Sequence, residues 1–335
     1  MSLRWLVIGL LTTLSLTGGG IAVWWYSHQE TKLLSPIGEL FGEKKPEKPL
    51  EKFTFDSLSR REFLGSEIKL ERVLEESETF TSYLFTFSSD DKKISGLINI
   101  PKKIGNKKLP VIVMLRGYVD RGKYQTGVGT QRAGEVLAKS GFITLAPDFL
   151  GYGESDPPEN DVWWERFNNP VVVLNLLASI KSLPQAEPEK VGIWAHSNGG
   201  QTALSVLEIS RQPLPTTLWA PVSKPFPYSV LYYTDEFDDE GKALRAELSR
   251  LERDYDVRQF SITDYFERIN APLQIHQGTA DEEVSLGWSD ELVSKLRQLK
   301  KEVVYYVYPG ADHNLVGSWE TVVSRDVAFF KENLK

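Results

Sequence analysis

Short apolar runs alternate with helical segments through most of the chain. Six runs of four to six residues are predicted to be strands, at residues 111–115, 142–147, 191–195, 216–220, 273–276 and 303–308. Most of them do not alternate apolar and polar side chains, which is typical of parallel strands buried on both faces. Helices are expected between them, at residues 130–140, 163–182, 198–209, 288–300 and 319–333. This order predicts an α/β fold with a doubly wound, mostly parallel sheet, whose functional side chains follow the carboxyl ends of strands.

A different pattern precedes these runs. Residues 79–87 are rich in Thr, Tyr and Phe, and residues 94–100 place an Ile or a Gly at every second position. The polar segment 88–93 joins the two stretches. Together they predict an antiparallel hairpin ahead of the parallel strands.

The N-terminal segment contains a long apolar run that is not expected to be a core helix. Residues 5–26 carry no charged side chain, and a helix of this length crosses a bilayer core of ~30 Å. A cleaved signal peptide is one interpretation, but the length of the run and the lack of a small-residue cleavage site favour a transmembrane anchor over residues 1–26. Residues 27–50, with three Pro among Lys and Glu, are predicted to be a linker to a folded domain at residues 51–335.

Flanking charges do not decide the orientation of this anchor. A single N-terminal anchor followed by such a linker is the usual way to hold an enzyme outside the cytoplasm, so we expect an extracytoplasmic domain. With Lys+Arg 39 against Asp+Glu 46, the net charge of −7 disfavours a nucleic-acid partner. The composition does not predict an oligomeric state.

Reactive side chains are few. The chain has no Cys, which excludes disulfides, thiol nucleophiles and Cys-ligated metal sites. Only four His are present, so His-dependent chemistry has few candidates. We expect neither a metal nor an organic cofactor.

The segment VGIWAHSNGGQTAL, residues 191–204, has the spacing of a nucleophile elbow. A predicted strand runs into a predicted helix through Ser197, and small residues stand two positions before and after it, at Ala195 and Gly199. Such a tight turn needs small neighbours because strand and helix crowd there. Ser-Asn-Gly-Gly also suits a helix cap, but the flanking strand and helix favour a nucleophilic role for Ser197.

A serine nucleophile needs a base, which is commonly His. His28 lies in the linker, His196 adjoins the nucleophile on a turn that should point it elsewhere, and His276 is expected inside a strand as a core residue. His313 directly follows the last strand, in a loop at the carboxyl edge of the sheet. We therefore predict that His313 is the base.

The carboxylate that orients this base is expected between Ser and His in chain order. Asp281 follows the strand 273–276 and meets that requirement. Asp312 is a rival only by adjacency to the base, and Glu282 and Glu283 are expected to be solvated. For the oxyanion we predict two backbone donors, the N–H of Asn198 and the N–H of Tyr118 in the loop after the strand 111–115.

These motifs resemble the α/β-hydrolase superfamily and, within it, the catalytic domain of prolyl oligopeptidase-like serine peptidases. The resemblance rests on the Ser197 elbow and on the segments APDFLGYGESD, IHQGTADEEV and YPGADHNL. Two departures stand out: Arg116 occupies a position where the family usually has His, and Phe149-Leu150 replace the usual x-Arg. Arg116 is expected to be structural or to bind a substrate carboxylate.

The 222–270 segment lies where this fold carries a lid, and it is rich in aromatic and acidic residues. We expect a solvated acidic run, with the hypothesis that Asp235 and Glu236 capture a substrate amino group. The resemblance implies a serine hydrolase that cleaves peptide or aminoacyl bonds through an acyl-enzyme. A carboxylesterase with the same machinery, and a non-catalytic binding module on the same fold, are the alternatives.

Overall fold

The computed structural model describes residues 48–102 and 107–335, apart from the side chain of Glu236. From Pro49 to Lys335 these residues belong to one compact unit. The predicted anchor at residues 1–26 and nearly all of the predicted linker lie outside the described residues. Within the described part of the chain, no helix is both long and apolar enough to span a bilayer.

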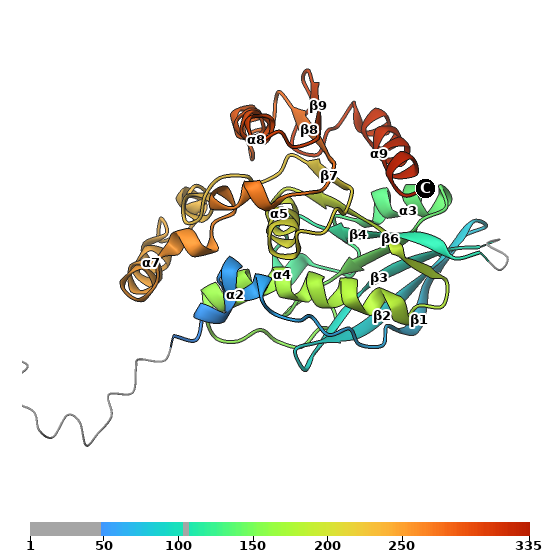
Figure 1. Cartoon of the computed structure of the whole chain (residues 1–335), viewed down its shortest axis with the longest axis horizontal. Helices are drawn as coiled ribbons and strands as arrows, with labels where there is room; N and C mark the ends of the chain where they lie inside the picture. The colour runs from blue at the N-terminus through green and yellow to red at the C-terminus, as the bar shows by residue number, and fades with distance from the viewer. Residues whose placement is uncertain (1–47, 103–106) are drawn as a thin grey trace, which may run out of the picture. The chain divides into compact units, whose positions relative to one another are not determined.

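One sheet organises the unit, with strand order β1-β2-β3-β5-β4-β6-β7-β8-β9 across the described residues (Figure 1). Strands β4 to β9 form its parallel part, and β1 to β3 form an antiparallel part that joins it through β3 and β5. The strands are β1 Lys69–Glu76, β2 Phe80–Ser89, β3 Lys92–Pro101, β4 Leu109–Leu115, β5 Ile143–Pro147, β6 Ala186–His196, β7 Thr216–Trp219, β8 Leu273–Gly278 and β9 Val303–Tyr308.

The parallel strands match the predicted apolar runs. The five residues Val111–Leu115 of β4 are almost fully buried, because helices cover both faces of the sheet. Strand β6 begins at Ala186 rather than at Val191, since Ala186 pairs with Leu109 at the start of β4. The prediction of a mostly parallel, doubly wound sheet is confirmed.

The antiparallel part contains one strand that the sequence did not predict. The hairpin of β2 and β3 is confirmed, whereas β1 was missed. All residues of β1 are exposed, so its sequence KLERVLEE shows neither a buried run nor a buried face. Its charged side chains suit a strand at the edge of the sheet, where unpaired backbone groups would otherwise recruit another strand.

Helices cover both faces of the sheet (Figure 1). Helices α2, α4 and α5 pack on one face, where they share the larger apolar core with the strands. Helices α3 and α9 pack together on the other face, over a second cluster. The bounds are α2 Phe55–Ser59, α3 Gln131–Lys139, α4 Val162–Ser179, α5 Asn198–Ser210, α8 Leu286–Gln298 and α9 Trp319–Asn333.

The lid segment, residues 222–270, connects β7 to β8. It contains the short helix α6 Tyr228–Leu231 and the longer α7 Lys242–Asp254, followed by the 3-10 turns Val257–Phe260, Ile262–Asp264 and Phe266–Arg268. Helix α7 lies at one side of the molecule, away from the sheet (Figure 1). The lid segment is therefore helical, as predicted.

A buried carboxylate joins the sheet to α9. Asp326 is fully buried and accepts hydrogen bonds from Trp194 Nε1 at 3.2 Å, Trp219 Nε1 at 2.8 Å and Gln274 Nε2 at 3.0 Å. Its Oδ1 also lies 3.0 Å from His276 Nε2, and His276 Nδ1 lies 2.7 Å from the Tyr308 hydroxyl. His276 is thus a fully hydrogen-bonded core residue, as the sequence predicted.

Replacing Asp326 should destabilise the fold. Asp326→Ala leaves four buried donors without an acceptor, and we expect a loss of about 3 kcal/mol or more in the free energy of unfolding. Urea unfolding followed by circular dichroism measures this loss. Glu332→Ala, an exposed change on the same helix, is the matched control and should shift stability by less than about 0.5 kcal/mol. Equal effects of the two changes would contradict this account of the cluster.

Candidate active site

Ser197 occupies a strained turn between β6 and α5. Its φ of 55° and ψ of −122° are rare for a residue with a side chain. The backbone holds this conformation at both ends: Ser197 N–H donates to Trp219 O at 2.9 Å, and Ser197 O accepts from Val222 N at 3.0 Å. The turn has the geometry of a nucleophile elbow, which projects its side chain above the sheet.

Close packing explains the small residues around this turn. A Cβ added at Gly199 would lie 2.2 Å from the Leu115 carbonyl oxygen, so only glycine fits between α5 and the end of β4. The loop after β4 also touches the elbow, since a Cβ at Gly117 would lie 3.0 Å from Ser197 Cβ and 3.5 Å from its Oγ. The backbone that follows Gly117 is therefore close to the Ser197 hydroxyl.

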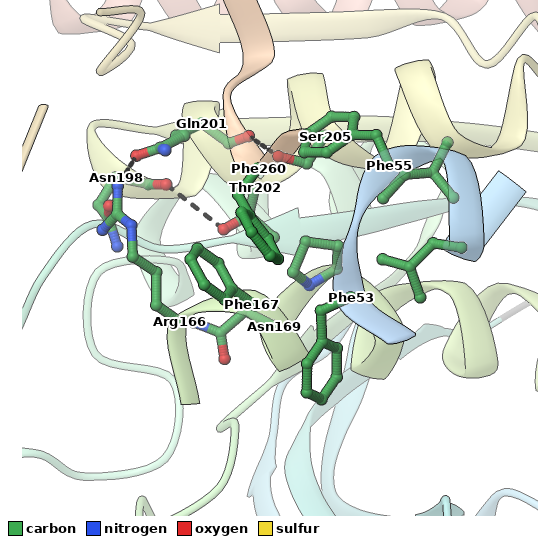
Figure 2. A pocket seen from close by; sticks show the side chains of 13 residues that line it. Phe53, Phe55, Arg166, Phe167, Asn169, Asn198, Gln201, Thr202, Ser205 and Phe260 are labelled. Atoms are coloured by element: carbon green, nitrogen blue, oxygen red, sulfur yellow. Dashed lines mark hydrogen bonds between the residues drawn. The ribbon is translucent and has the colours of Figure 1, made fainter. Parts of the chain in front are cut away.

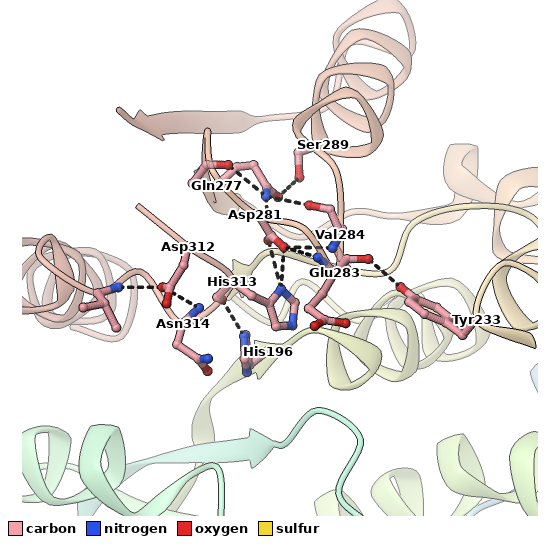
Figure 3. Close-up of polar contacts among 12 residues, drawn as sticks. His196, Tyr233, Gln277, Asp281, Glu283, Val284, Ser289, Asp312, His313 and Asn314 are labelled. Atoms are coloured by element: carbon pink, nitrogen blue, oxygen red, sulfur yellow. Dashed lines mark hydrogen bonds and ion pairs between the residues drawn. The ribbon is translucent and has the colours of Figure 1, made fainter. Parts of the chain in front are cut away.

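Asp281 and His313 meet at the carboxyl edge of the sheet, as the sequence predicted for two loops that follow β8 and β9. His313 Nδ1 lies 3.0 Å from Asp281 Oδ1 and 2.9 Å from Oδ2 (Figure 3). Burial by itself would raise the pKa of Asp281, but hydrogen bonds from His313 and from the Val284 amide outweigh it and lower the pKa. The carboxylate is thus ionised. It holds the imidazole with Nδ1 protonated and with Nε2 on the side of the ring that faces away from Asp281.

Gln277, a residue that the sequence did not indicate, holds the Asp281 carboxylate in position. Its side chain is fully buried, and Nε2 donates to Asp281 Oδ2 at 2.9 Å and to Val284 O at 3.0 Å (Figure 3). Its Oε1 accepts from Ser289 Oγ at 2.7 Å. A glutamine on a strand carries no sequence signal for this role, because the contact depends on how the following loop folds back.

His196 lies closer to the base than the sequence suggested. We expected the turn to point it elsewhere, but its Nε2 lies 3.0 Å from the His313 carbonyl oxygen and the two rings are 4.7 Å apart (Figure 3). Since a carbonyl only accepts, Nε2 carries the proton. Desolvation and the neighbouring His313 lower the pKa of His196 to about 4, so it is neutral at pH 7 and supports the His313 loop as a hydrogen-bond donor.

Ser197 and His313 are not joined by a hydrogen bond in the described structure, which is common before substrate binds. Of the two predicted oxyanion donors, Asn198 lies at the elbow and Tyr118 lies in the loop after β4. Asn198 is the first residue of α5, so its N–H has no acceptor within that helix. Tyr118 follows Gly117 in the loop beside Ser197, and its side chain is exposed.

Arg116 is buried among aromatic rings beside the loop that carries Tyr118. Its guanidinium lies 4.5 Å from the Tyr124 ring centre and 4.1 Å from that of Tyr152. It donates to Gly117 O at 2.9 Å and to Asp148 O at 3.2 Å. These contacts support the structural interpretation of Arg116, whose buried Nε has no described hydrogen-bond partner.

The acidic part of the lid segment is exposed. Asp235 lies in the turn Thr234–Glu236 with its side chain in solvent, and the side chain of Glu236 lies outside the described structure. The nearby Tyr233 donates to Glu283 O at 3.3 Å, and Glu283 N–H donates to Asp281 Oδ1 at 3.0 Å (Figure 3). The lid segment is therefore tied to the loop that carries the acid.

Two recesses flank the elbow. One, of about 590 Å³, is lined by His196, Trp194, Trp219, Asn314 and Trp319, among others. The other, of about 30 Å³, lies between α4, α5 and the N-terminal turns beside Asn198 (Figure 2). Within the described residues, no group of three or more His, Asp or Glu side chains is arranged to hold a metal ion.

Comparison with known proteins agrees with this arrangement. Residues 133–335, which include all three candidate catalytic side chains, match the prolyl oligopeptidase family, Peptidase_S9. The chain belongs to this family. It is a serine hydrolase of the S9 peptidase type with the α/β-hydrolase fold, and the resemblance seen in the sequence is confirmed.

Relatives of this S9 protein are distant. An uncharacterized peptidase, YtmA of Bacillus subtilis, is 24% identical over 69% of this chain and 85% of its own length. A putative dipeptidyl aminopeptidase IV from Bacteroides ovatus superposes with a TM-score of 0.60 at 14% identity over 78% of this chain. This chain spans only 37% of that protein's length. Acetyl xylan esterase 1 from Thermoanaerobacterium sp. JW/SL YS485 gives a TM-score of 0.58 at 14% identity, over 85% of this chain and 94% of its own.

The pKa of His196 makes the stability of the S9 domain depend on pH. Because the folded pKa is about 4 and the ordinary value is about 6.5, the unfolded chain takes up a proton first as pH falls through this window. Stability should therefore fall from pH 6.5 toward pH 4, by up to about 1.4 kcal/mol per pH unit. His196→Gln keeps an N–H donor without a titrating ring, so its unfolding free energy, measured in urea across this range, should fall less steeply. Parallel curves for the two proteins would contradict this assignment.

Proposed function

We propose that this S9 protein cleaves peptide or aminoacyl bonds through an acyl-enzyme. The observation that carries the proposal is the Asp281–His313 pair placed at the same sheet edge as the strained Ser197 turn. In this proposal Ser197 Oγ attacks the scissile carbonyl while His313 Nε2 takes its proton. Asp281 holds the ring orientation and stabilises the imidazolium that forms.

The oxyanion that develops would be held by the N–H groups of Asn198 and Tyr118. Support comes from the free position of Asn198 at the start of α5 and from the contact between Gly117 and Ser197. His313 then returns the proton to the leaving amine, and water hydrolyses the acyl-enzyme by the same steps in reverse order. The chemistry needs no group beyond these side chains and amides.

Active-site labelling tests the proposed nucleophile and base. A fluorophosphonate probe should label the native protein, with the modified peptide containing Ser197, and Ser197→Ala should not be labelled. Ser197→Ala and His313→Ala should each lower kcat/KM about 10³-fold or more, and Asp281→Asn somewhat less. Ser324→Ala, a change on α9 far along the chain, serves as the control and should be neutral. Full activity of His313→Ala would overturn the proposal.

Esterase activity is the alternative, because the same machinery accepts a better leaving group. The acetyl xylan esterase and the putative dipeptidyl aminopeptidase IV superpose on this chain with similar TM-scores, so the fold does not separate them. Hydrolysis of a matched ester, aminoacyl amide and blocked peptide separates them directly. Amide turnover supports the peptidase, ester turnover alone supports the esterase, and no turnover with unlabelled Ser197 supports a binding module.

We also propose that residues 1–26 anchor the chain in a membrane, with the hydrolase outside the cytoplasm. The support is the uncharged run 5–26 followed by the Pro-, Lys- and Glu-containing segment 27–50. Protease added to intact cells should cut within residues 27–50 and release the hydrolase from the membrane fraction, as detected by immunoblotting. Protection in intact cells that disappears on lysis would place the hydrolase in the cytoplasm, and recovery without any membrane association would overturn the anchor.

A further inference from the structure

Arg166 is a cation beside the elbow that the proposed mechanism does not use. It lies in the second turn of α4 and reaches toward the start of α5, where it lines the 30 Å³ recess together with Asn198 (Figure 2). Asn198 directly follows Ser197, so the recess that Arg166 lines reaches the residue next to the proposed nucleophile. This position makes Arg166 a candidate for substrate recognition.

The partners of Arg166 leave its charge uncompensated. Its Nη2 donates to Gln201 Oε1 and, at 3.3 Å, to Ser229 Oγ, and both acceptors are neutral. None of the ion pairs among the described side chains includes Arg166. Desolvation lowers its pKa to about 10, which still leaves it protonated at pH 7. Arg166 is partly buried, and a partly desolvated cation without a counter-ion gains stabilisation from an arriving anion.

The geometry of the donors and the recess favours one kind of anion. Both described hydrogen bonds of Arg166 leave from Nη2, so Nε and Nη1 donate to no described group. A guanidinium binds a carboxylate through two parallel N–H donors. The recess has room for about two water molecules, and Phe53, Phe55, Phe167 and Phe260 form apolar walls around it (Figure 2).

We infer that Arg166 forms a carboxylate subsite beside Ser197, so that preferred substrates carry a carboxylate on an apolar arm near the scissile bond. This inference rests on the proposed hydrolase function and names its substrate class. The acidic lid residues suggested a substrate with a cationic amino group, whereas this subsite binds a substrate carboxylate. The structure favours the latter, because Asp235 is exposed whereas Arg166 lines a recess beside the elbow. Gln201 and Ser229 would orient the guanidinium from α5 and from α6.

Matched substrates that differ in one carboxylate test the inference. On the acyl side, the 4-nitroanilides of acetyl-Glu and acetyl-Gln have the same shape and differ in charge. On the leaving-group side, Ala-Ala and its C-terminal amide form the equivalent pair. We expect the native protein to prefer the charged member of one pair by about 10- to 100-fold in kcat/KM, the range of a hydrogen bond to a charged group. Arg166→Met should abolish that preference, and Arg166→Lys should retain part of it.

Arg250→Met removes an exposed cation from the lid helix α7 and is the matched control, with no change expected in either pair. Equal losses for charged and neutral substrates in Arg166→Met would mean that Arg166 only supports the fold, and would overturn the subsite. A preference for a free amino group over an acetylated one, unchanged in Arg166→Met, would favour the acidic lid instead and would also overturn it.

A second experiment distinguishes failure of this inference from failure of the proposed function. It measures how added ligands protect Ser197 from labelling, and it uses only the native protein. Glutarate should slow fluorophosphonate labelling of native Ser197, whereas the uncharged glutaramide should not. Labelling that neither compound slows, in a protein without charge preference, rejects the subsite and leaves the hydrolase intact. Absence of labelling altogether rejects the proposed nucleophile.

Discussion

The site depends on the contact between the elbow and the end of β4. Gly199 packs its backbone directly against the Leu115 carbonyl, and this close approach leaves room for the sharp turn in which Ser197 has a positive φ. Hydrogen bonds from Ser197 N–H to Trp219 O and from Val222 N–H to Ser197 O then hold the turn against relaxation. Strain of this kind persists only where the surroundings fix the backbone on several sides.

The same contact brings the remaining parts of the site to the serine. With α5 pressed onto β4, the loop at Gly117 lies against Ser197, and Arg116 fixes that loop from a cage of Tyr124 and Tyr152. Beneath the cage, Asp148 is fully buried and accepts from Tyr124 and Thr126. Burial raises the pKa of Asp148 despite these hydrogen bonds. Arg116 thus holds the loop that carries Gly117 and Tyr118 in place through packing and a hydrogen bond to Gly117 O.

The sequence predicted the parts of this architecture that local patterns encode. The apolar runs of the parallel strands and the pentad around Ser197 are local, and so is the position of His313 after the last strand. The roles of His196, Gln277 and Arg166 are not local, because each depends on a residue at least four positions away that only the fold brings near. Strand β1 was missed for the opposite reason: it buries no side chain, so its sequence carries no pattern.

Charge is distributed in the site in a way that composition does not suggest. The chain is acidic overall, with a net charge of −7, and the lid adds an exposed acidic turn. Acidic groups in solvent are hydrated and screened over about 10 Å, so they act weakly on a group held at the elbow. Arg166 is partly buried and hydrogen-bonds to neutral partners, so its field is screened less than that of the exposed groups. In the inferred subsite, a substrate carboxylate would therefore meet the partly buried Arg166, and the exposed carboxylates of the surface would act on it only weakly.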